Sequence, residues 1–418
     1  MTTPLEGIKV LDFGQVATCP IVGMVMAEMG ADVIKVEKIQ GESMREGIPE
    51  GIPWSPSKSG KDEPLWMWVN RSKRALCVDG KTEKGREIIN KLFKRSDVAI
   101  HNFRPKGAAK MGLIYDELAA INPRIILMNL FAYGETGPKR NWAGGDAWAQ
   151  GASGMVALQS AYSTRPSVVG FGGSDISGAW AGMLAVLLAL LARERTGEGQ
   201  EVTTSLLNAS IFSQGMTLAD FLVTDNLVTR STVAKGYFPY GAYQAKDGEM
   251  VTFYGGGESW PYFCKILKIE HLLENPRYAT QEQREELCWE LYPIIDEAFS
   301  CKNRAEWQQE FREAKLRADP ALNHRELLTD PQVIANEMIE EVDHPVWGRI
   351  KTPGIPVKLK KTPGKVKWAS PLIGQHTEEV LQELGCGQEE IEQLIEEGVV
   401  RTPTRWVKRS SADDSPEG

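Results

Sequence analysis

The stretch that decides the fold is GIKVLDFGQVATCPIVGMVMAEMGADVIKVE, residues 7–37. Residues 7–13 and 32–37 are rich in apolar and β-branched side chains, which favours two short strands. Between them, Pro20 suits the first position of a helix and Gly30 suits its end. A strand, a loop, a helix and a second strand within about thirty residues predict a βαβ unit with parallel strands.

The same alternation continues to residue 130. After a polar stretch over 41–72, which predicts a long loop, the expected elements are a strand over 73–78, a helix over 82–95, and then a strand over 97–102, a helix over 115–121 and a strand over 124–130. Strands that alternate with helices are typical of a doubly wound, Rossmann-like α/β domain with a parallel sheet.

The second half of the chain has a different sequence pattern. Residues 240–244 and 250–254 are joined by Asp247-Gly248, a pattern that predicts an antiparallel hairpin, and helical patterns follow it. At 418 residues the chain is long enough for more than one domain. We expect a large α/β domain over 1–224, a smaller α+β domain over 225–330, a return to the large domain over 331–408, and a disordered tail over 409–418.

The longest apolar run covers residues 176–192, directly after Asp175. It is shorter than the ~20 residues that a membrane span needs, so we predict a buried core helix and no membrane partner. Asp175 itself has two interpretations. An aspartate at a helix start is usually an N-cap, but on a glycine-lined floor it could also be a nucleophile or a general base.

Composition excludes several classes of function. A net charge of −8 argues against a general nucleic-acid binder. The N-terminus lacks a basic region followed by an apolar one, so we expect no export signal and a cytoplasmic protein. The six cysteines show no C-x-x-C spacing and no neighbouring histidine, which predicts buried thiols and no metal site.

A group of basic residues falls near predicted strand ends. Its members are Lys73, Arg74, Arg104, Lys106 and Lys110. Two interpretations of this group are equally good: ordinary solvated surface charge, or a phosphate-binding site at the sheet edge. Residues 255–257 are three consecutive glycines after a predicted strand, which suit either a plain turn or a lid.

Several motifs, in order along the chain, carry a resemblance to a known family. They are PLEGIKVLDFGQ from Pro4, GADVIKVE from Gly30, HNFRP from His101, NPRIILMNLFAYGETGP from Asn122, DISGAW from Asp175, RTGEGQ from Arg195 and PLIGQHTEEVLQELG from Pro371. Together they resemble the class III CoA-transferases, the family of formyl-CoA transferase and the carnitine CoA-transferase. The resemblance extends from residue 4 to about residue 400.

The resemblance implies a chemistry and a site. Asp175 falls at the family's nucleophilic aspartate, which forms an aspartyl–acyl anhydride and then an aspartyl-CoA thioester, with coenzyme A entering as acyl-CoA and no metal. Gly256 and Gly257 match the glycine loop that covers the site, and Glu135 would be a supporting acid. Residues that match or flank the family's CoA-binding positions are Val16, Ala17, Lys38, Arg74, Asn102, Phe103, Arg104 and Lys110. Ala17 stands where formyl-CoA transferase has a glutamine.

Two alternatives remain beside a transferase. The α-methylacyl-CoA racemases resemble this chain too, but they use a histidine in a G-H-D segment, which here reads Gly144-Gly145-Asp146. A racemase without that histidine lacks one of its two proton-transfer groups, which favours the transferase. The other alternative is a CoA-binding, non-catalytic subunit, and the presence of Asp175 argues against it.

The resemblance also implies an interlocked dimer, either of identical chains or with a related subunit. Succinyl-CoA is the expected donor. Four tryptophans in predicted loops could line an acceptor pocket for an aryl-substituted or dicarboxylic acid such as benzylsuccinate, or could belong to the core or an interface. They are Trp66, Trp68, Trp142 and Trp148.

Overall fold

The computed structural model describes residues 2–46, 63–162, 166–236, 238–248, 250–254 and 259–403. The chain divides into two compact units. The first comprises residues 1–155, 168–215 and 337–418, and the second comprises residues 156–167 and 216–336. Sequence analysis puts the limits at 224 and 330 and assigns no part of 156–167 to the smaller domain. The predicted tail over 409–418 lies outside the described residues.

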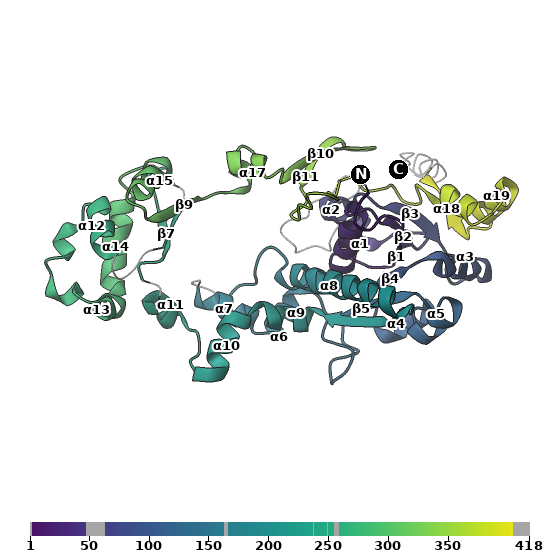
Figure 1. The fold of residues 1–418 in the computed structure, drawn as a ribbon, viewed down its shortest axis with the longest axis horizontal. Helices are drawn as coiled ribbons and strands as arrows, with labels where there is room; N and C mark the ends of the chain where they lie inside the picture. The colour runs from purple at the N-terminus through teal and green to yellow at the C-terminus, as the bar shows by residue number, and fades with distance from the viewer. Residues whose placement is uncertain are drawn as a thin grey trace, which may run out of the picture. The chain divides into compact units, whose positions relative to one another are not determined.

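The first unit is built on a seven-stranded sheet in the order β12-β3-β2-β1-β4-β5-β6. All neighbouring strands are parallel except β12, which runs antiparallel to β3 at the edge. The predicted α/β class with a mostly parallel sheet is therefore confirmed. The strands are β1 (Lys9–Asp12), β2 (Asp32–Glu37), β3 (Arg74–Val78), β4 (Val98–His101), β5 (Ile126–Phe131), β6 (Glu201–Ser205) and β12 (Val400–Arg401), as Figure 1 shows.

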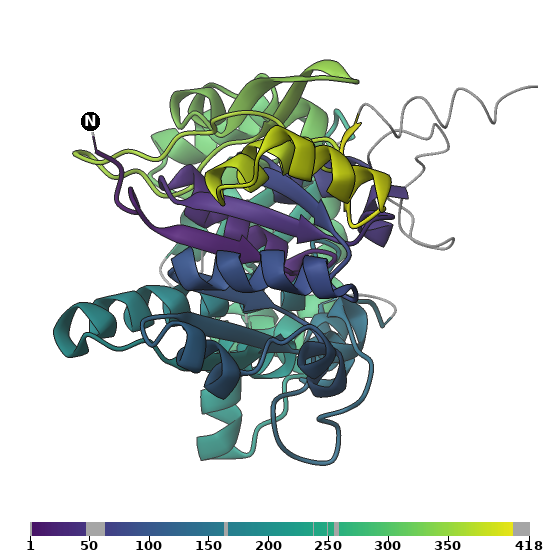
Figure 2. The same cartoon turned by 90° about the vertical axis from the view of Figure 1, so that its right-hand side faces the viewer.

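Alternate residues of the strands divide the core between the two faces of the sheet. On β1, Val10 belongs to one buried cluster and Leu11 to the other. The first cluster contains α1 (Thr18–Glu28) and α8 (Gly173–Thr196). The second contains α3 (Glu83–Arg95), α5 (Tyr115–Ile121), α18 (Thr377–Glu383) and α19 (Gln388–Glu396), so helices cover both faces (Figure 2). This alternation is what a strand period of two dictates when both faces are covered.

The first unit has further elements, of which β10 and β11 form a separate two-stranded antiparallel sheet. They are η1 (Ser43–Glu46), α2 (Pro64–Asn70), α3 (Glu83–Arg95), α4 (Pro105–Lys110), α5 (Tyr115–Ile121), α6 (Asp146–Ala152), α9 (Leu206–Ser213), β10 (Ile339–His344), β11 (Gly348–Pro353), α18 (Thr377–Glu383) and α19 (Gln388–Glu396). The predicted loop over 41–72 is wrong in its last part, because α2 forms there with Glu63 capping its first turn.

Helix α8 is longer than predicted, at 24 residues, because it begins before Asp175 and continues through the basic residues to Thr196. By length and composition it could cross a membrane. One of its faces, however, packs into the core of this unit. Glycines permit the close contact, since a Cβ at Gly178 would lie 2.9 Å from Leu206 Cδ2 and one at Gly182 would lie 2.8 Å from Met128 Cε.

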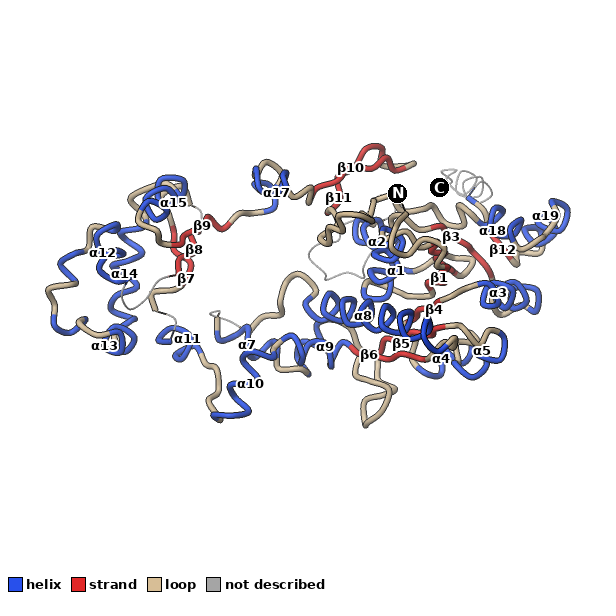
Figure 3. Tube along the Cα trace, in the orientation of Figure 1, coloured by secondary structure: helices blue, strands red, loops and turns tan. Residues whose placement is uncertain are grey.

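The second unit contains a small antiparallel sheet in the order β7-β8-β9 (Figure 3). The predicted hairpin is confirmed, with Gly241 opposite Phe253. Strand β9 was not predicted. The elements that lie wholly or mainly in this unit are α7 (Met155–Ala161), α10 (Gly215–Thr224), α11 (Arg230–Gly236), β7 (Gly241–Gln244), β8 (Met250–Tyr254), α12 (Trp260–Leu267), η3 (Glu270–Leu272), η4 (Pro276–Tyr278), α13 (Gln281–Glu286), α14 (Cys288–Phe299), α15 (Arg304–Glu313), β9 (Arg317–Ala321), α16 (His324–Leu327) and α17 (Pro331–Ala335).

Candidate active site

The candidate site lies where the loops after β1 and β4 meet. These neighbouring strands stand where the strand order reverses direction, and ligands of open α/β sheets bind outside the carboxyl ends of strands at such a point. Two hydrogen bonds join the loops. The Gln15 N–H donates to Asn102 Oδ1 at 2.8 Å, and Asn102 Nδ2 donates to the Gln15 carbonyl at 2.8 Å. The loop over 14–17 is thereby fixed to the end of β4.

Val16 is the strained residue of this loop. Its φ of 65° places a β-branched side chain in the left-handed region, which costs roughly 1–2 kcal/mol. Its N–H donates to Glu42 Oε1 at 2.6 Å, and its side chain is exposed. Strain of this kind persists only where surrounding contacts hold it, and it clusters at functional sites.

Asp175 lies in the first turn of α8 and faces the start of α1. The Thr18 hydroxyl donates to Asp175 Oδ1 at 2.5 Å. Asp175 does not cap its own helix, so that interpretation is wrong. The N-cap residue is Gly172, and Asp146 Oδ1 accepts the N–H groups of Ser174 at 2.8 Å and of Asp175 at 3.1 Å. A second carboxylate caps the helix, which leaves the Asp175 carboxylate available for another task.

The electrostatics of Asp175 differ from those of a surface aspartate. Burial raises its pKa to about 6, the Thr18 hydrogen bond acts to lower that pKa, and the charge of Asp146 raises it further. At neutral pH the group is therefore mostly ionised but more basic than usual. A carboxylate perturbed by burial and by a specific charge, at the ligand-binding edge of a sheet, is typical of a functional site.

A network of buried ion pairs contacts the loop over 14–17. Lys73 Nζ contacts Asp12 Oδ2 at 2.7 Å, and Lys35 Nζ lies 4.0 Å from Asp12 Oδ1 and 3.2 Å from Glu42 Oε2. All four side chains are at most 4% exposed. Lys35 also donates to the Gly14 carbonyl, and Asp12 Oδ1 accepts the Gly14 N–H at 2.8 Å. Burial lowers the pKa of Lys73 to about 8.

Several predicted site residues lie after the carboxyl ends of strands β2, β4 and β5. Lys38 is exposed and follows β2 directly. Asn102, Phe103 and Arg104 follow β4, and Phe103 stacks on His101 with ring centroids 5.8 Å apart. Lys110 is exposed at the end of α4. Glu135, the predicted supporting acid, is exposed in the turn after β5.

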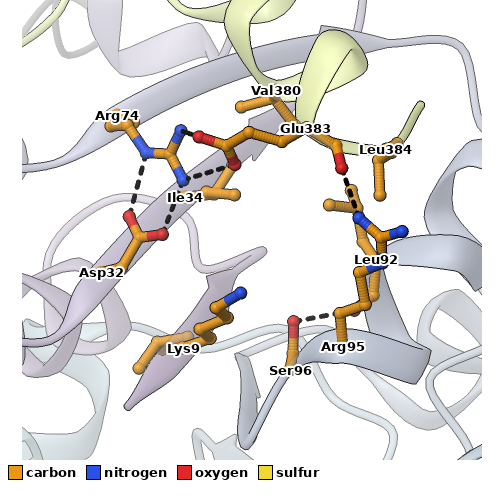
Figure 4. A pocket seen from close by; sticks show the side chains of 11 residues that line it. Lys9, Asp32, Ile34, Arg74, Leu92, Arg95, Ser96, Val380, Glu383 and Leu384 are labelled. Carbon is orange, nitrogen blue, oxygen red and sulfur yellow. Dashed lines mark hydrogen bonds and ion pairs between the residues drawn. The ribbon is translucent and has the colours of Figure 1, made fainter. Parts of the chain in front are cut away.

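Arg74 does not join this group. It begins β3, at the amino-terminal edge of the parallel sheet, and its guanidinium forms ion pairs with Asp32, Glu379 and Glu383. A cavity of about 270 Å³ lies there. Figure 4 shows the side chains that line it. Lys73 precedes Arg74 and is fully buried. These two residues therefore do not contribute to a phosphate site at the opposite edge.

The remaining predicted residues separate into two sets. Gly256 and Gly257 lie outside the described residues. Of the four tryptophans, Trp66 and Trp68 are in α2 rather than in a loop, and Trp66 is fully buried with the Arg45 guanidinium 4.0 Å from its ring centre. Trp66 is thus a core residue, whereas Trp142 and Trp148 are exposed.

Comparison with known proteins decides the family. The sequence model described as "CoA-transferase family III" matches residues 5–377. The chain belongs to CoA-transferase family III. It is 31% identical over 400 residues to the human protein named succinyl-CoA:glutarate CoA-transferase, covering 95% of this chain and 90% of the relative. It is 31% identical over 416 residues to the formyl-CoA:oxalate CoA-transferase of Streptomyces coelicolor, covering 95% and 99%.

A solved structure agrees with this assignment. The crystal structure of a CAIB/BAIF family protein from Brucella suis matches with a TM-score of 0.83 and 27% identity, covering 92% of this chain and all of that one. As a family III CoA-transferase, the chain acts on acyl-CoA and acid substrates. Within the described ranges, no group of three or more His, Cys, Asp or Glu side chains is placed to hold a metal ion.

Three residues of the candidate site were not predicted from the sequence. Thr18, Glu42 and Asp146 contact Asp175 or the Val16 loop from positions far away in sequence. Two weak signals were present: Asp146 stands in the segment that is compared with the racemases' G-H-D motif, and the polar Thr18 lies in an apolar segment. Cys19, which follows Thr18, is fully buried, and burial raises the pKa of its thiol well above its usual value, so it is no nucleophile.

Replacement of Thr18 by Val should shift the pH dependence of the transferase. The variant removes a hydrogen bond that favours the charged form of Asp175, so its pKa should rise above about 6. We expect kcat/KM to begin falling at a pH about one unit higher than in the wild type. Thr18→Ser, which keeps the hydroxyl, is the control. An unshifted profile for Thr18→Val would show that this bond does not govern the reacting group.

Proposed function

We propose that Asp175 is the covalent nucleophile of CoA transfer. The observation that carries this proposal is a carboxylate freed from helix capping by Asp146, held by Thr18 and made more basic by burial. With Oδ1 engaged by Thr18, the Oδ2 atom is the one left to attack. Carboxylate nucleophiles divide one difficult exchange into easier covalent steps.

The proposed sequence of steps balances without ATP. The Asp175 carboxylate attacks the thioester carbonyl, the C–S bond breaks, and an acyl anhydride and CoA thiolate result. The thiolate attacks the aspartyl carbonyl and releases the donor acid, leaving an Asp175–CoA thioester. The acceptor carboxylate then attacks this thioester, which gives a second mixed anhydride and releases CoA thiolate. The thiolate attacks the acceptor's acyl carbonyl, forming the product thioester and regenerating the Asp175 carboxylate. An anhydride hydrolyses readily, so water must be excluded from the site.

The protein's part is to bind and orient the acyl-CoA. We assign the thioester carbonyl to the backbone of Val16 and Ala17, at the switch point of the sheet. We assign the CoA adenine and phosphates to the surface beyond β2 and β4, where exposed cations are available. Its proposed residues are Lys38, Asn102, Phe103, Arg104 and Lys110. Gly256 and Gly257 are proposed to cover the site, and Glu135 to act as a supporting acid, by family resemblance alone.

For substrates we propose succinyl-CoA as donor and a small dicarboxylic acid as acceptor. The names of relatives support both, because they include succinyl-CoA:glutarate, formyl-CoA:oxalate and succinyl-CoA–D-citramalate transferases. An aryl-substituted acceptor such as benzylsuccinate has less support, since Trp66 is in the core. A racemase has less support still, because Gly145 stands where that chemistry uses a histidine.

We further propose that the working form is a dimer, with either a second copy or a related subunit, in the cytoplasm. The outer face of α8 supports this proposal, because apolar side chains there are 40–59% exposed. They are Trp180, Leu184, Leu187, Leu188 and Leu191. An apolar stripe of this kind is typical of an interface. Light scattering of the purified chain should give a mass of about twice 46.3 kDa, and a monomer would exclude the form with a second copy.

Mass spectrometry tests the nucleophile directly. The enzyme is incubated with succinyl-CoA, trapped with hydroxylamine and digested. We expect a hydroxamate on the peptide that contains Asp175, and no such product with free CoA. Acceptance of glutarate, oxalate or benzylsuccinate in turnover assays would then identify the acceptor class. A hydroxamate on another peptide, or none with any acyl-CoA, would refute the assignment of Asp175.

A further inference from the structure

Glu42 holds the strained loop by a contact that no resemblance points to. It follows β2 and is buried, with its own N–H donating to Glu37 Oε2 at 3.1 Å. Its Oε1 accepts the Val16 N–H at 2.6 Å, and its Oε2 lies 3.2 Å from Lys35 Nζ. A bond of this length to an ionised acceptor is among the stronger hydrogen bonds in proteins.

The Glu42–Lys35 ion pair binds two backbone groups of the loop over 14–17. Lys35 donates to the Gly14 carbonyl, while Glu42 accepts the N–H of Val16, two residues further on. Each partner therefore neutralises the other and binds one backbone group of the same turn. The carboxylates of Asp12 and Glu42 raise the pKa of Lys35 above its usual value, although burial alone would lower it. Lys35 thus stays charged at neutral pH.

The other end of the loop is tied to the reacting group. Thr18 comes two residues after Val16, begins α1 and donates to Asp175. Within the described ranges no side chain caps the first turn of α1. The path from Glu42 to Asp175 is therefore short, passing from Val16 through Ala17 to Thr18. A shift of Val16 would move both the backbone offered to a thioester and the hydroxyl that orients Asp175.

We propose that Glu42, paired with Lys35, is a positioning residue for CoA transfer. It holds residues 14–17 in the left-handed turn at Val16 that sets Thr18 against Asp175. It touches no reacting atom itself, and the inference rests on the proposed role of Asp175. A purely structural ion pair would instead affect stability and leave the rate per folded molecule unchanged.

The test is Glu42→Gln, measured by single-turnover formation of the Asp175 adduct from succinyl-CoA. We expect adduct formation to slow by about 10-fold or more, because small misplacements near the reacting atoms carry penalties of that order. The affinity for free CoA should change by less than about 3-fold, since remote CoA contacts are untouched. Adduct formation at the wild-type rate in folded protein would overturn the proposal.

Glu28→Gln is the matched control. Glu28 is also a carboxylate in a buried ion pair, with Arg71, but it lies at the far end of α1 from the loop. It should lose stability without losing the adduct rate. A rate loss equal to that of Glu42→Gln would overturn the proposal, because it would show that any broken buried pair in this unit has the same effect.

Val16→Gly provides a rescue. Glycine adopts positive φ without strain, so the turn should need less support from Glu42. The 10-fold penalty of Glu42→Gln should therefore shrink to about 3-fold or less in the Val16→Gly background, and an undiminished penalty would contradict the mechanism. If Glu42→Gln does not fold, Glu42→Asp keeps the charge near Lys35 but shortens the reach to Val16, and the same slow adduct formation is expected.

These measurements distinguish the positioning role of Glu42 from the proposed nucleophilic role of Asp175. Labelling of Asp175 in the wild type together with unchanged rates in the Glu42 variants would refute the positioning role alone. Absence of any Asp175 adduct in the wild type would refute the proposed nucleophile, and the positioning role with it.

Discussion

Asp175→Asn is expected to lower the turnover of CoA transfer by about 10⁴-fold or more, because it removes the carboxylate that we propose forms the covalent intermediates. The same change should make the protein more stable at pH 8. The folded state raises the pKa of Asp175 from 3.8 to about 6, so its contribution to stability is present below pH 4 and is lost as the pH rises through 6. A neutral amide avoids this loss, with an expected gain of about 1–2 kcal/mol in the free energy of unfolding.

Turnover assays and denaturant unfolding at pH 5 and pH 8 measure both effects. The stability gain should be smaller at pH 5, where the wild-type carboxyl is largely protonated. Asp116→Asn, at an exposed position on α5, is the control and should change neither quantity appreciably. Turnover within tenfold of the wild type would end the assignment of Asp175 as nucleophile. A loss of stability in Asp175→Asn would show that the carboxylate is there for structure.

Lys73→Met is expected to have the largest effect on folding, lowering the free energy of unfolding by about 3–5 kcal/mol. Lys73 Nζ is fully buried and donates to Asp12, to the Pro20 carbonyl at 2.8 Å and to Asn70 Oδ1 at 2.8 Å. Without it, the countercharge that Asp12 keeps among the described residues is Lys35, at 4.0 Å. Urea unfolding followed by circular dichroism measures the loss.

Two further variants define the cause of that loss. Lys91→Met, at an exposed position on α3, should change stability by less than about 0.5 kcal/mol. Asp12→Asn combined with Lys73→Met should recover at least half of the loss, because the uncompensated charge is gone. A double variant no more stable than Lys73→Met would mean that lost packing, and not electrostatics, dominates.

The sequence predicted the parallel sheet well because its signals are local. Short β-branched runs such as 32–37 and the helix signals between them require no knowledge of distant contacts. Helix α2 was missed since its tryptophans stand in a stretch otherwise rich in Gly and Pro, which reads as loop. The start of α8 was misread because Gly173 and Ser174 are poor helix formers, and a distant carboxylate stabilises that turn.

The candidate site was predicted only in part. Asp175 and the residues after β4 could be predicted because family motifs contain them. Glu42 could not, because its partner Val16 lies 26 residues away and the contact depends on how two loops meet. Arg74 was placed at the wrong edge, although it stands at the start of the predicted strand over 73–78 and ligands bind at the carboxyl ends of parallel strands. Trp66 was predicted to lie in a loop because the sequence showed no recognised signal for helix α2.

The capping of α8 by Asp146 has a consequence for reactivity. A carboxylate at a helix N-terminus is normally stabilised by the dipole, which makes it a weaker base and a poorer attacking group. Asp146 already occupies that favourable field through the N–H groups of Ser174 and Asp175. Asp175 therefore keeps the higher basicity that favours its proposed attack on a thioester, while Asp146 stabilises the helix end. The charge of Asp146 stabilises the start of α8, and the Asp175 carboxylate keeps its electron density.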